Sequence, residues 1–135
     1  MQDNRTDRER KEARLQTLAE NYFDAFSKKS IGRLNLMFAE NVVLRDWEHH
    51  VQGKEAVLEL NKIMFDDVDW IKAKPQNIVC FTPGASTISC DVVVAELEVY
   101  AGALGDKDVQ PILVTDIIEF DSEGKIIALR AYKGN

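Results

Sequence analysis

The chain has 135 residues, of which 45% are hydrophobic and 30% are charged, and its formal net charge is −6. These values predict one soluble domain over residues 1–135, with residues 1–6 as a loose N-terminal tail. The acidic balance argues against nucleic acid as a partner, and no apolar run approaches the roughly 20 residues that span a membrane. The charged first residues do not resemble a secretory signal, which predicts a cytoplasmic protein with reduced cysteines at Cys80 and Cys90. Without a CxxC spacing, the two cysteines make no recognisable metal set.

The first element is a long amphipathic helix. The residues Thr6-Asp7-Arg8-Glu9 fit a capping box, which marks a helix start. Apolar residues then recur at helical spacing, among them Leu15, Leu18 and Tyr22. The pattern therefore predicts a helix over about 7–27 with Tyr22 on its buried side.

A short helix, a strand and a third helix follow. Residues 28–38 predict a turn and a short helix that Ser30 could cap, and residues 42–47 predict a strand. Gly53 precedes a third helical pattern. We predict that the buried stripe of this third helix consists of Ala56, Leu60, Ile63 and Met64.

The second half of the chain has a period of two. Four strands are predicted within residues 71–81, 86–100, 109–120 and 125–132, with turn signals at Pro83-Gly84 and at 122–124. A longer hairpin loop is predicted over 101–108. Helices that precede consecutive strands predict an α+β fold, a cone in which a strongly bent mixed or antiparallel sheet wraps around three helices.

Two acids fall on apolar strand faces. Asp46 alternates with Val42 and Leu44, and Asp116 shares a face with Val114 and Ile118. Burial of an unpaired carboxylate is costly, so these faces are expected to line a hollow instead of a solid core. With Tyr22, the two acids make a candidate site.

Such a set suits proton abstraction from the carbon next to a carbonyl group. One carboxylate would take the proton, while the tyrosine and a second, neutral carboxyl would donate hydrogen bonds to the enolate oxygen. Other roles are open for each residue. Asp46 could bond a nearby backbone amide or His50, Asp116 could pair with Tyr22, and Tyr22 could serve packing alone.

The sequence resembles the nuclear transport factor 2-like superfamily, in its ketosteroid isomerase and SnoaL-like polyketide cyclase branch. The resemblance rests on NYFDAFSKKSIGRLNLMFAENVVLRDW, the following VQGKEAV, and VTDIIEFDSEGKIIALRAYKG. It implies that Tyr22 is the oxyanion tyrosine, Asp46 the general base and Asp116 the protonated oxyanion-hole acid, the chemistry for which ketosteroid isomerase is the standard example. Trp47 stands where the isomerases usually have proline, and the isomerase pattern does not require His49 or His50.

The sequence thus predicts a ketosteroid isomerase-like or SnoaL-like enzyme (isomerase, dehydratase or cyclase) for a small apolar carbonyl compound, with no cofactor or metal required. The expected substrate-binding residues are Trp47, His50, Phe65, Val114 and Ile118. Two alternatives are a binding module that only orients an apolar ligand, and a homo-oligomeric association domain.

The apolar pattern of one sheet face predicts that it binds a second copy of the chain. Val93, Ala95, Leu97 and Val99 are expected on the outer face, beside Leu113, Thr115 and Ile117. This set is too apolar to stay in water, and burial against a second copy would form a homodimer, as the superfamily resemblance also implies. Glu96 and Glu98 share the other face with Val94 and Tyr100.

Overall fold

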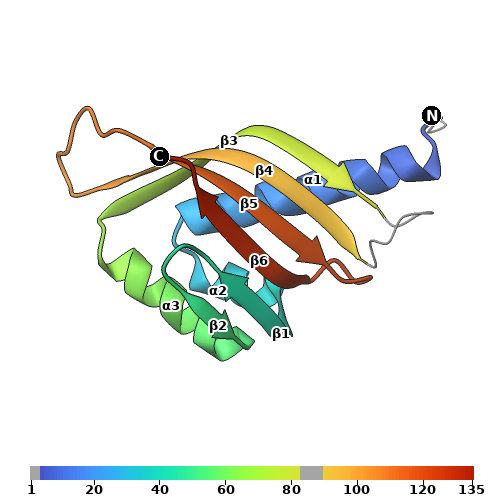
Figure 1. The fold of residues 1–135 in the computed structure, drawn as a ribbon, viewed down its shortest axis with the longest axis horizontal. Coiled ribbons are helices and arrows are strands. Elements are labelled where there is room, and N and C mark those ends of the chain that lie inside the picture. The colour runs from blue at the N-terminus through green and yellow to red at the C-terminus, as the bar shows by residue number, and fades with distance from the viewer. Residues whose placement is uncertain (1–3, 83–89) are drawn as a thin grey trace.

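The protein is an α+β cone in which a bent sheet wraps around helices (Figure 1). The computed structural model describes residues 4–82 and 90–135. The described helices are α1 (Asp7–Ser27), α2 (Ile31–Met37) and α3 (Lys54–Asp66). The strands are β1 (Phe38–Arg45), β2 (His50–Gln52), β3 (Trp70–Phe81), β4 (Asp91–Gly102), β5 (Ile112–Phe120) and β6 (Ile126–Lys133). The predicted fold class is therefore confirmed, and no helix in the described ranges is long and apolar enough to cross a membrane.

The sheet is mixed. Its strand order is β2-β1-β6-β5-β4-β3; β1 and β6 are parallel, and every other neighbouring pair is antiparallel. Register shifts interrupt the β3–β4 ladder between Pro75 and Asn77 and the β5–β6 ladder between Glu119 and Phe120. Such irregularities increase the local twist of a sheet. They fit a sheet that curls around α1, which lies behind β3 to β5 in Figure 1.

Local sequence signals define the ends of the first two helices. Thr6 caps α1, because its Oγ1 accepts a hydrogen bond from the Glu9 backbone N–H at 3.1 Å. Ser30 caps α2 through the Arg33 N–H at 3.3 Å. Both predicted caps are confirmed.

The C-terminal end of α1 is fixed on the sheet. Ser27 Oγ accepts a hydrogen bond from the Ala73 N–H of β3 at 2.9 Å. Near the other end of α1, Lys11 Nζ lies 3.2 Å from Asp91 Oδ1 of β4. The buried side of α1, which includes Leu15, Ala19 and Tyr22, is thereby held against the inner face of the sheet.

The predicted turn over residues 122–124 is confirmed. Asp121 Oδ1 accepts the N–H groups of Glu123 and Lys125, both at 2.9 Å. Gly124 has φ = +83°, and a Cβ there would lie 2.8 Å from Arg14 Nη2 of α1. The positive φ favours glycine here, whereas the flexible end of the Arg14 side chain could move aside for a Cβ. The predicted Pro83-Gly84 turn lies outside the described residues.

Two predictions need correction: the bounds of the first strand and the orientation of the third helix. The strand expected over 42–47 runs instead from Phe38 to Arg45, directly after α2, so Asp46 and Trp47 follow the strand. The third helix is rotated from its expected orientation, since Ala56 and Ile63 are exposed. Its buried residues are Val57, Leu60, Asn61 and Phe65. The packing of α3 against β1 and α2 determines which side of the helix is buried. The expected side and the observed side both carry apolar residues, so the sequence pattern alone allows both orientations.

The expected outer face of β4 was also wrong. The register places Val93 opposite Ile118, Ala95 opposite Asp116 and Leu97 opposite Val114. Cross-strand partners share a face, so these residues belong to the inner face together with the β5 acid. The outer face of β4 instead carries Val92, Val94, Glu96 and Glu98. Alternation defines two faces, but the sequence alone does not tell which one meets the helices.

Candidate active site

A cavity of about 270 Å³ lies inside the cone, enclosed by α1, α3 and the inner face of the sheet. Its wall is mainly apolar and aromatic, with Phe23, Phe26, Met64, Leu97, Val99 and Leu129 among the contributors. Several polar or charged residues also line it: Tyr22, Arg45, Asp46, Asn61, Gln110, Asp116 and Arg130. An apolar cavity with a few convergent polar groups is the usual form of a small-molecule site.

Asp116 comes from the middle of β5. Strand alternation turns it inward between Val114 and Ile118. Its neighbours across the ladders are Ala95 of β4 and Ala131 of β6. Because both neighbours are alanine, their side chains are small and leave space beside the carboxyl group.

The Asp116 carboxyl group has no compensating partner. It makes no hydrogen bond or ion pair with any residue in the described ranges, although it lines the cavity. Burial therefore raises the pKa of Asp116 to about 7, from an ordinary value of 3.8. Near neutral pH a large fraction of this carboxyl is protonated and can donate a hydrogen bond.

Tyr22 comes from the buried side of α1 and is 6% exposed. Its ring lies against Phe23, Phe26 and Phe38, with centroid distances of 5.5, 6.3 and 6.3 Å. Burial raises the pKa of the Tyr22 hydroxyl well above its usual range, and the charge of Asp116 raises it further. The hydroxyl therefore stays protonated and is available as a donor at the cavity wall.

Asp46 is held in the turn that follows β1. Its Oδ1 accepts the backbone N–H groups of Glu48 and His49 at 2.8 and 2.7 Å. The His49 Nδ1 lies 3.0 Å from Oδ1 and 3.2 Å from Oδ2. The expected bond to a nearby backbone amide is present, whereas the imidazole partner is His49 and not His50. Asp46 thus shapes the turn and also lines the cavity.

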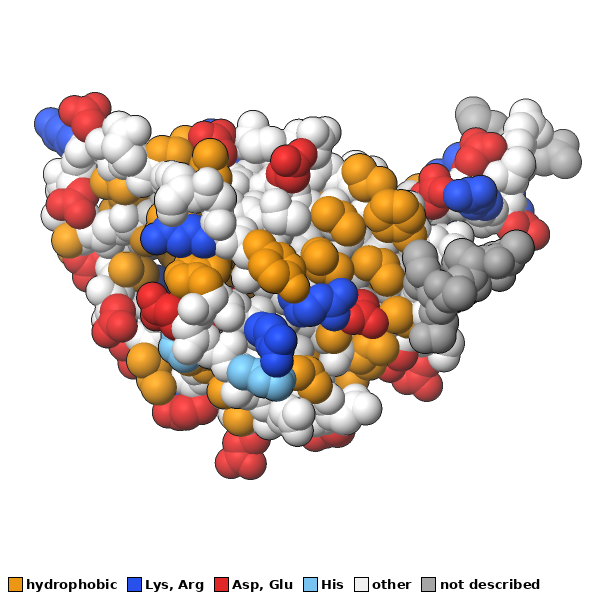
Figure 2. Space-filling view, viewed as in Figure 1, with side chains coloured by type: hydrophobic (Ala, Val, Ile, Leu, Met, Phe, Trp, Pro, Cys, Tyr) orange, Lys and Arg blue, Asp and Glu red, His pale blue; other side chains and the backbone are white. Residues whose placement is uncertain are grey.

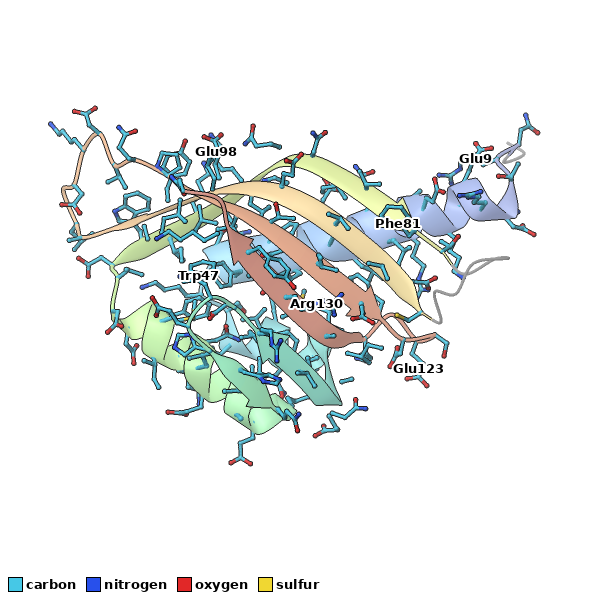
Figure 3. The ribbon with its side chains drawn as sticks, viewed as in Figure 1. Glu9, Trp47, Phe81, Glu98, Glu123 and Arg130 are labelled. Atoms are coloured by element: carbon cyan, nitrogen blue, oxygen red, sulfur yellow. The ribbon has the colours of Figure 1, made fainter. Side chains whose placement is uncertain are left out.

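The other predicted substrate-binding residues divide into two groups. Trp47 and Val114 line the cavity, and Trp47, which is 46% exposed, stands at the β1–β2 turn (Figure 3). Phe65, Ile118 and His50 are not among the lining residues. Phe65 and Ile118 are packed in the core, and the exposed His50 lies 3.2 Å from Arg45. The two adjacent histidines thus contact different partners.

Asn61 was missed by the sequence analysis. It lies on α3, four residues after Val57 and four before Phe65, and all three are buried. Its amide nitrogen is buried without a hydrogen-bond partner in the described part of the chain. An asparagine between two buried apolar residues at this spacing was the available signal.

Together these groups combine donors and acceptors around an apolar space. Tyr22 and neutral Asp116 can donate to an oxygen atom, and the Asp46 carboxylate is a potential proton acceptor. No group in this set requires a metal or an organic cofactor for proton transfer.

Comparison with known proteins agrees with this fold. The family model of the SnoaL-like domain matches residues 19–129, which is most of the chain. The chain belongs to the SnoaL-like family. The matched range includes Tyr22, Asp46, Asn61 and Asp116, and of the lining residues only Arg130 and Ala131 lie beyond it. No curated protein shows significant sequence similarity to the chain.

Solved structures show the same NTF2-like fold. A proposed dehydratase of the NTF2-like family from Streptomyces avermitilis has a TM-score of 0.76 at 12% identity, covering 94% of this chain and 98% of that one. An LEH-like epoxide hydrolase from M. tuberculosis has a TM-score of 0.71 at 17% identity, covering 92% and 85%. A proposed ketosteroid isomerase from Kribbella flavida has a TM-score of 0.70 at 13% identity, covering 92% and 80%. At these identities the similarity establishes the fold and not the reaction.

Proposed function

We propose that this SnoaL-like protein is an enzyme that abstracts a proton next to the carbonyl group of a small apolar compound. The observation that carries the proposal is an unpartnered carboxyl group, Asp116, on the wall of an apolar cavity that Tyr22 and Asp46 also line. The reaction would be an isomerisation, a dehydration or an aldol-type cyclisation, because all three begin with the same step.

In the proposed step, Asp46 takes a proton from the carbon next to the carbonyl group. The electron pair of the broken C–H bond moves towards the carbonyl oxygen and forms an enolate. Tyr22 and neutral Asp116 donate hydrogen bonds to this oxygen. The proton then returns to another carbon in an isomerisation, joins a leaving hydroxyl as water in a dehydration, or goes to the new alkoxide in a cyclisation.

The environment of the cavity supports this assignment. Hydrogen-bond donors stabilise a developing oxyanion most strongly where water is excluded, and most of this wall is apolar. The family relationship adds support, since structural neighbours include a proposed polyketide cyclase from Sinorhizobium meliloti and the proposed ketosteroid isomerase.

A second assignment of roles exchanges the two acids. Three of the polar contacts of Asp46 go to Oδ1, and they tie the carboxylate to its turn. Asp116 has no such contact and could instead be the base, with Tyr22 as the oxyanion donor. This assignment requires Asp116 to be ionised, whereas the first requires it to be protonated, so the pH dependence of the rate distinguishes them.

The first experiment is a fluorescence titration with equilenin, a fused-ring phenol that mimics a dienolate. Wild type is compared with Asp116→Asn and Tyr22→Phe, and circular dichroism checks that each variant is folded. We expect tight binding by wild type and at least tenfold weaker binding by each variant. Absence of binding by three folded proteins would contradict a steroid-sized oxyanion site.

Hydrogen–deuterium exchange tests the chemistry without knowledge of the natural substrate. A panel of apolar ketones, beginning with 2-tetralone, is incubated with the protein in D₂O, and the loss of the proton next to the carbonyl group is followed by NMR. We expect catalysed exchange for at least one ketone. Binding of equilenin without exchange of any ketone would favour the non-catalytic binding module.

We also propose that the outer sheet face binds a second copy of the chain. Exposed apolar side chains gather on this face (Figure 2), and they include Val79, Phe81, Leu113 and Tyr132. Sedimentation velocity tests the proposal. Phe81→Lys should dissociate the dimer, while the control Leu104→Lys, on the loop after β4, should leave it intact. A wild-type monomer at micromolar concentration contradicts the proposal.

A further inference from the structure

The side chain of Asn61 is the least explained polar group of the cavity. It is 2% exposed, lines the cavity, and has a buried amide nitrogen without a hydrogen-bond partner in the described residues. Buried side-chain amides are normally hydrogen-bonded, because removal from water without a replacement bond costs free energy. A single unsatisfied amide in this place therefore needs an explanation.

Packing does not explain the choice of residue. Val57 and Phe65 lie one turn before and one turn after Asn61, and both are buried. A leucine of similar size would continue this apolar stripe and would bring no unsatisfied group into the interior. Local departures from such packing rules tend to occur at functional sites.

The amide is also free to serve a ligand. No hydrogen bond to a described residue fixes its orientation, so rotation about the last side-chain bond breaks no bond within this part of the protein. The N–H₂ group can therefore turn to the cavity that the residue lines. Asn61 lies on α3, whereas Tyr22 and Asp116 lie on α1 and β5, so the amide belongs to a separate part of the wall.

We propose that Asn61 is a specificity-determining residue whose amide donates a hydrogen bond to a second oxygen atom of the substrate. The inference rests on the proposed function, in which Tyr22 and Asp116 hold the first, reacting oxygen. The substrate class is then narrower than an apolar carbonyl compound. It is a largely apolar molecule with a carbonyl group at the reacting end and a further hydroxyl, ketone or ester oxygen on its other part.

The first test measures the thermal stability of the free protein. Asn61→Leu should raise the melting temperature by about 2–6 °C, because the buried unsatisfied amide is replaced by an apolar group. Ile63→Leu is the control, since Ile63 lies on α3 beside the cavity residues but is exposed and does not line the cavity, and it should change the melting temperature little. A lower melting temperature for Asn61→Leu overturns the proposal, because it assigns the amide a structural role.

The second test measures selectivity between two kinds of probe. Fluorescence titration compares 2-naphthol, which has one oxygen, with the isomers of dihydroxynaphthalene, which have two. Wild type and Ile63→Leu should bind at least one of these isomers about tenfold more tightly than 2-naphthol. Asn61→Leu should lose this preference and keep its affinity for 2-naphthol.

The outcomes separate the inference from the proposed function. If Asp116→Asn weakens 2-naphthol binding but Asn61→Leu leaves the preference unchanged, the proposed function stands and the role of Asn61 is wrong. If 2-naphthol binds equally to wild type and Asp116→Asn, or binds to neither, the proposed function fails and the inference fails with it.

Discussion

Asp46 and Asp116 line the same cavity, but the fold surrounds them differently. Asp46 lies in the turn after β1, where two backbone N–H groups and the His49 imidazole contact its carboxyl group. Asp116 lies in the middle of β5, where Val114 and Ile118 on the same face are apolar and the cross-strand neighbours are alanines. One acid is surrounded by donors and the other by hydrocarbon.

This difference bears on what each carboxyl group can do in the site. Hydrogen bonds from N–H groups stabilise a carboxylate, whereas burial in an apolar wall favours the neutral acid. Such a pair of environments is what a site needs when one acid must accept a proton and the other must donate a hydrogen bond. Substitution of either acid tests this contrast.

Asp46→Asn should have the largest effect. The amide keeps the size of the side chain and one acceptor oxygen for the turn, but it cannot take a proton. We expect catalysed ketone exchange to fall by about 10²–10⁴-fold, the usual contribution of a positioned base. NMR exchange rates in D₂O measure it, with equilenin affinity as the control for an intact cavity. An exchange rate within about threefold of wild type means that Asp46 only shapes the turn.

Asp116→Asn should change how stability depends on pH. The pKa of Asp116 is about 7 in the folded protein against 3.8 ordinarily, so the folded state holds more protons between these values. Its contribution to stability is therefore fully present below about pH 4 and is lost as pH rises to about 7. The size is at most of the order of 4 kcal/mol, at about 1.4 kcal/mol for each pKa unit.

Urea unfolding of the two proteins from pH 4 to pH 8 measures this change. Other titrating groups are shared, so the difference in the free energy of unfolding isolates Asp116. The variant should gain stability relative to wild type as pH rises from 4 to 7, and the difference should level off above pH 7. A difference that does not change with pH contradicts the description of Asp116 as an acid in an apolar wall without a partner among the described residues.

The rate of exchange should also depend on pH with a defined sign. If Asp116 donates to the enolate oxygen, kcat/KM falls about tenfold for each pH unit above about pH 7, where the carboxyl group loses its proton. If Asp116 is the base instead, kcat/KM rises up to about pH 7 and then levels off. Asp116→Asn should remove the transition near pH 7 in the first case and abolish exchange in the second.

Local signals in the sequence were sufficient for several parts of the fold. The caps at Thr6 and Ser30 and the turn at Gly124 depend on residues within three or four positions of each other. Strand alternation also grouped Asp116 with Val114 and Ile118 on one face of β5. These features could be predicted because the interactions that determine them are short in sequence.

Features that depend on long-range packing could not be predicted in the same way. The register of β4 against β5 decides that Val93 and Leu97 face inward, and both faces of β4 are apolar enough for either choice. The rotation of α3 depends on β1 and α2, and it brings Asn61 to the cavity in place of Ile63. The partner of Asp46 depends on the path of the turn, which selects His49 over His50.

His49→Ala tests the smallest part of the contrast between the two acids. The imidazole contacts Asp46, but its side chain is 37% exposed, and the two backbone N–H groups remain after the substitution. Partly exposed pairs of this kind contribute about 0–1 kcal/mol. We therefore expect a loss of stability below about 1 kcal/mol in urea unfolding.

The same variant also tests whether His49 takes part in the chemistry. His49 is not among the residues that line the cavity, so the exchange rate of His49→Ala should stay within about threefold of wild type. His50→Ala is the matched control, because His50 contacts Arg45 instead of Asp46. A rate loss of tenfold or more that is specific to His49→Ala would mean that the carboxylate acts through the imidazole. The proton acceptor would then be the Asp46–His49 pair, and the contrast with Asp116 would be one between a relay and a single acid.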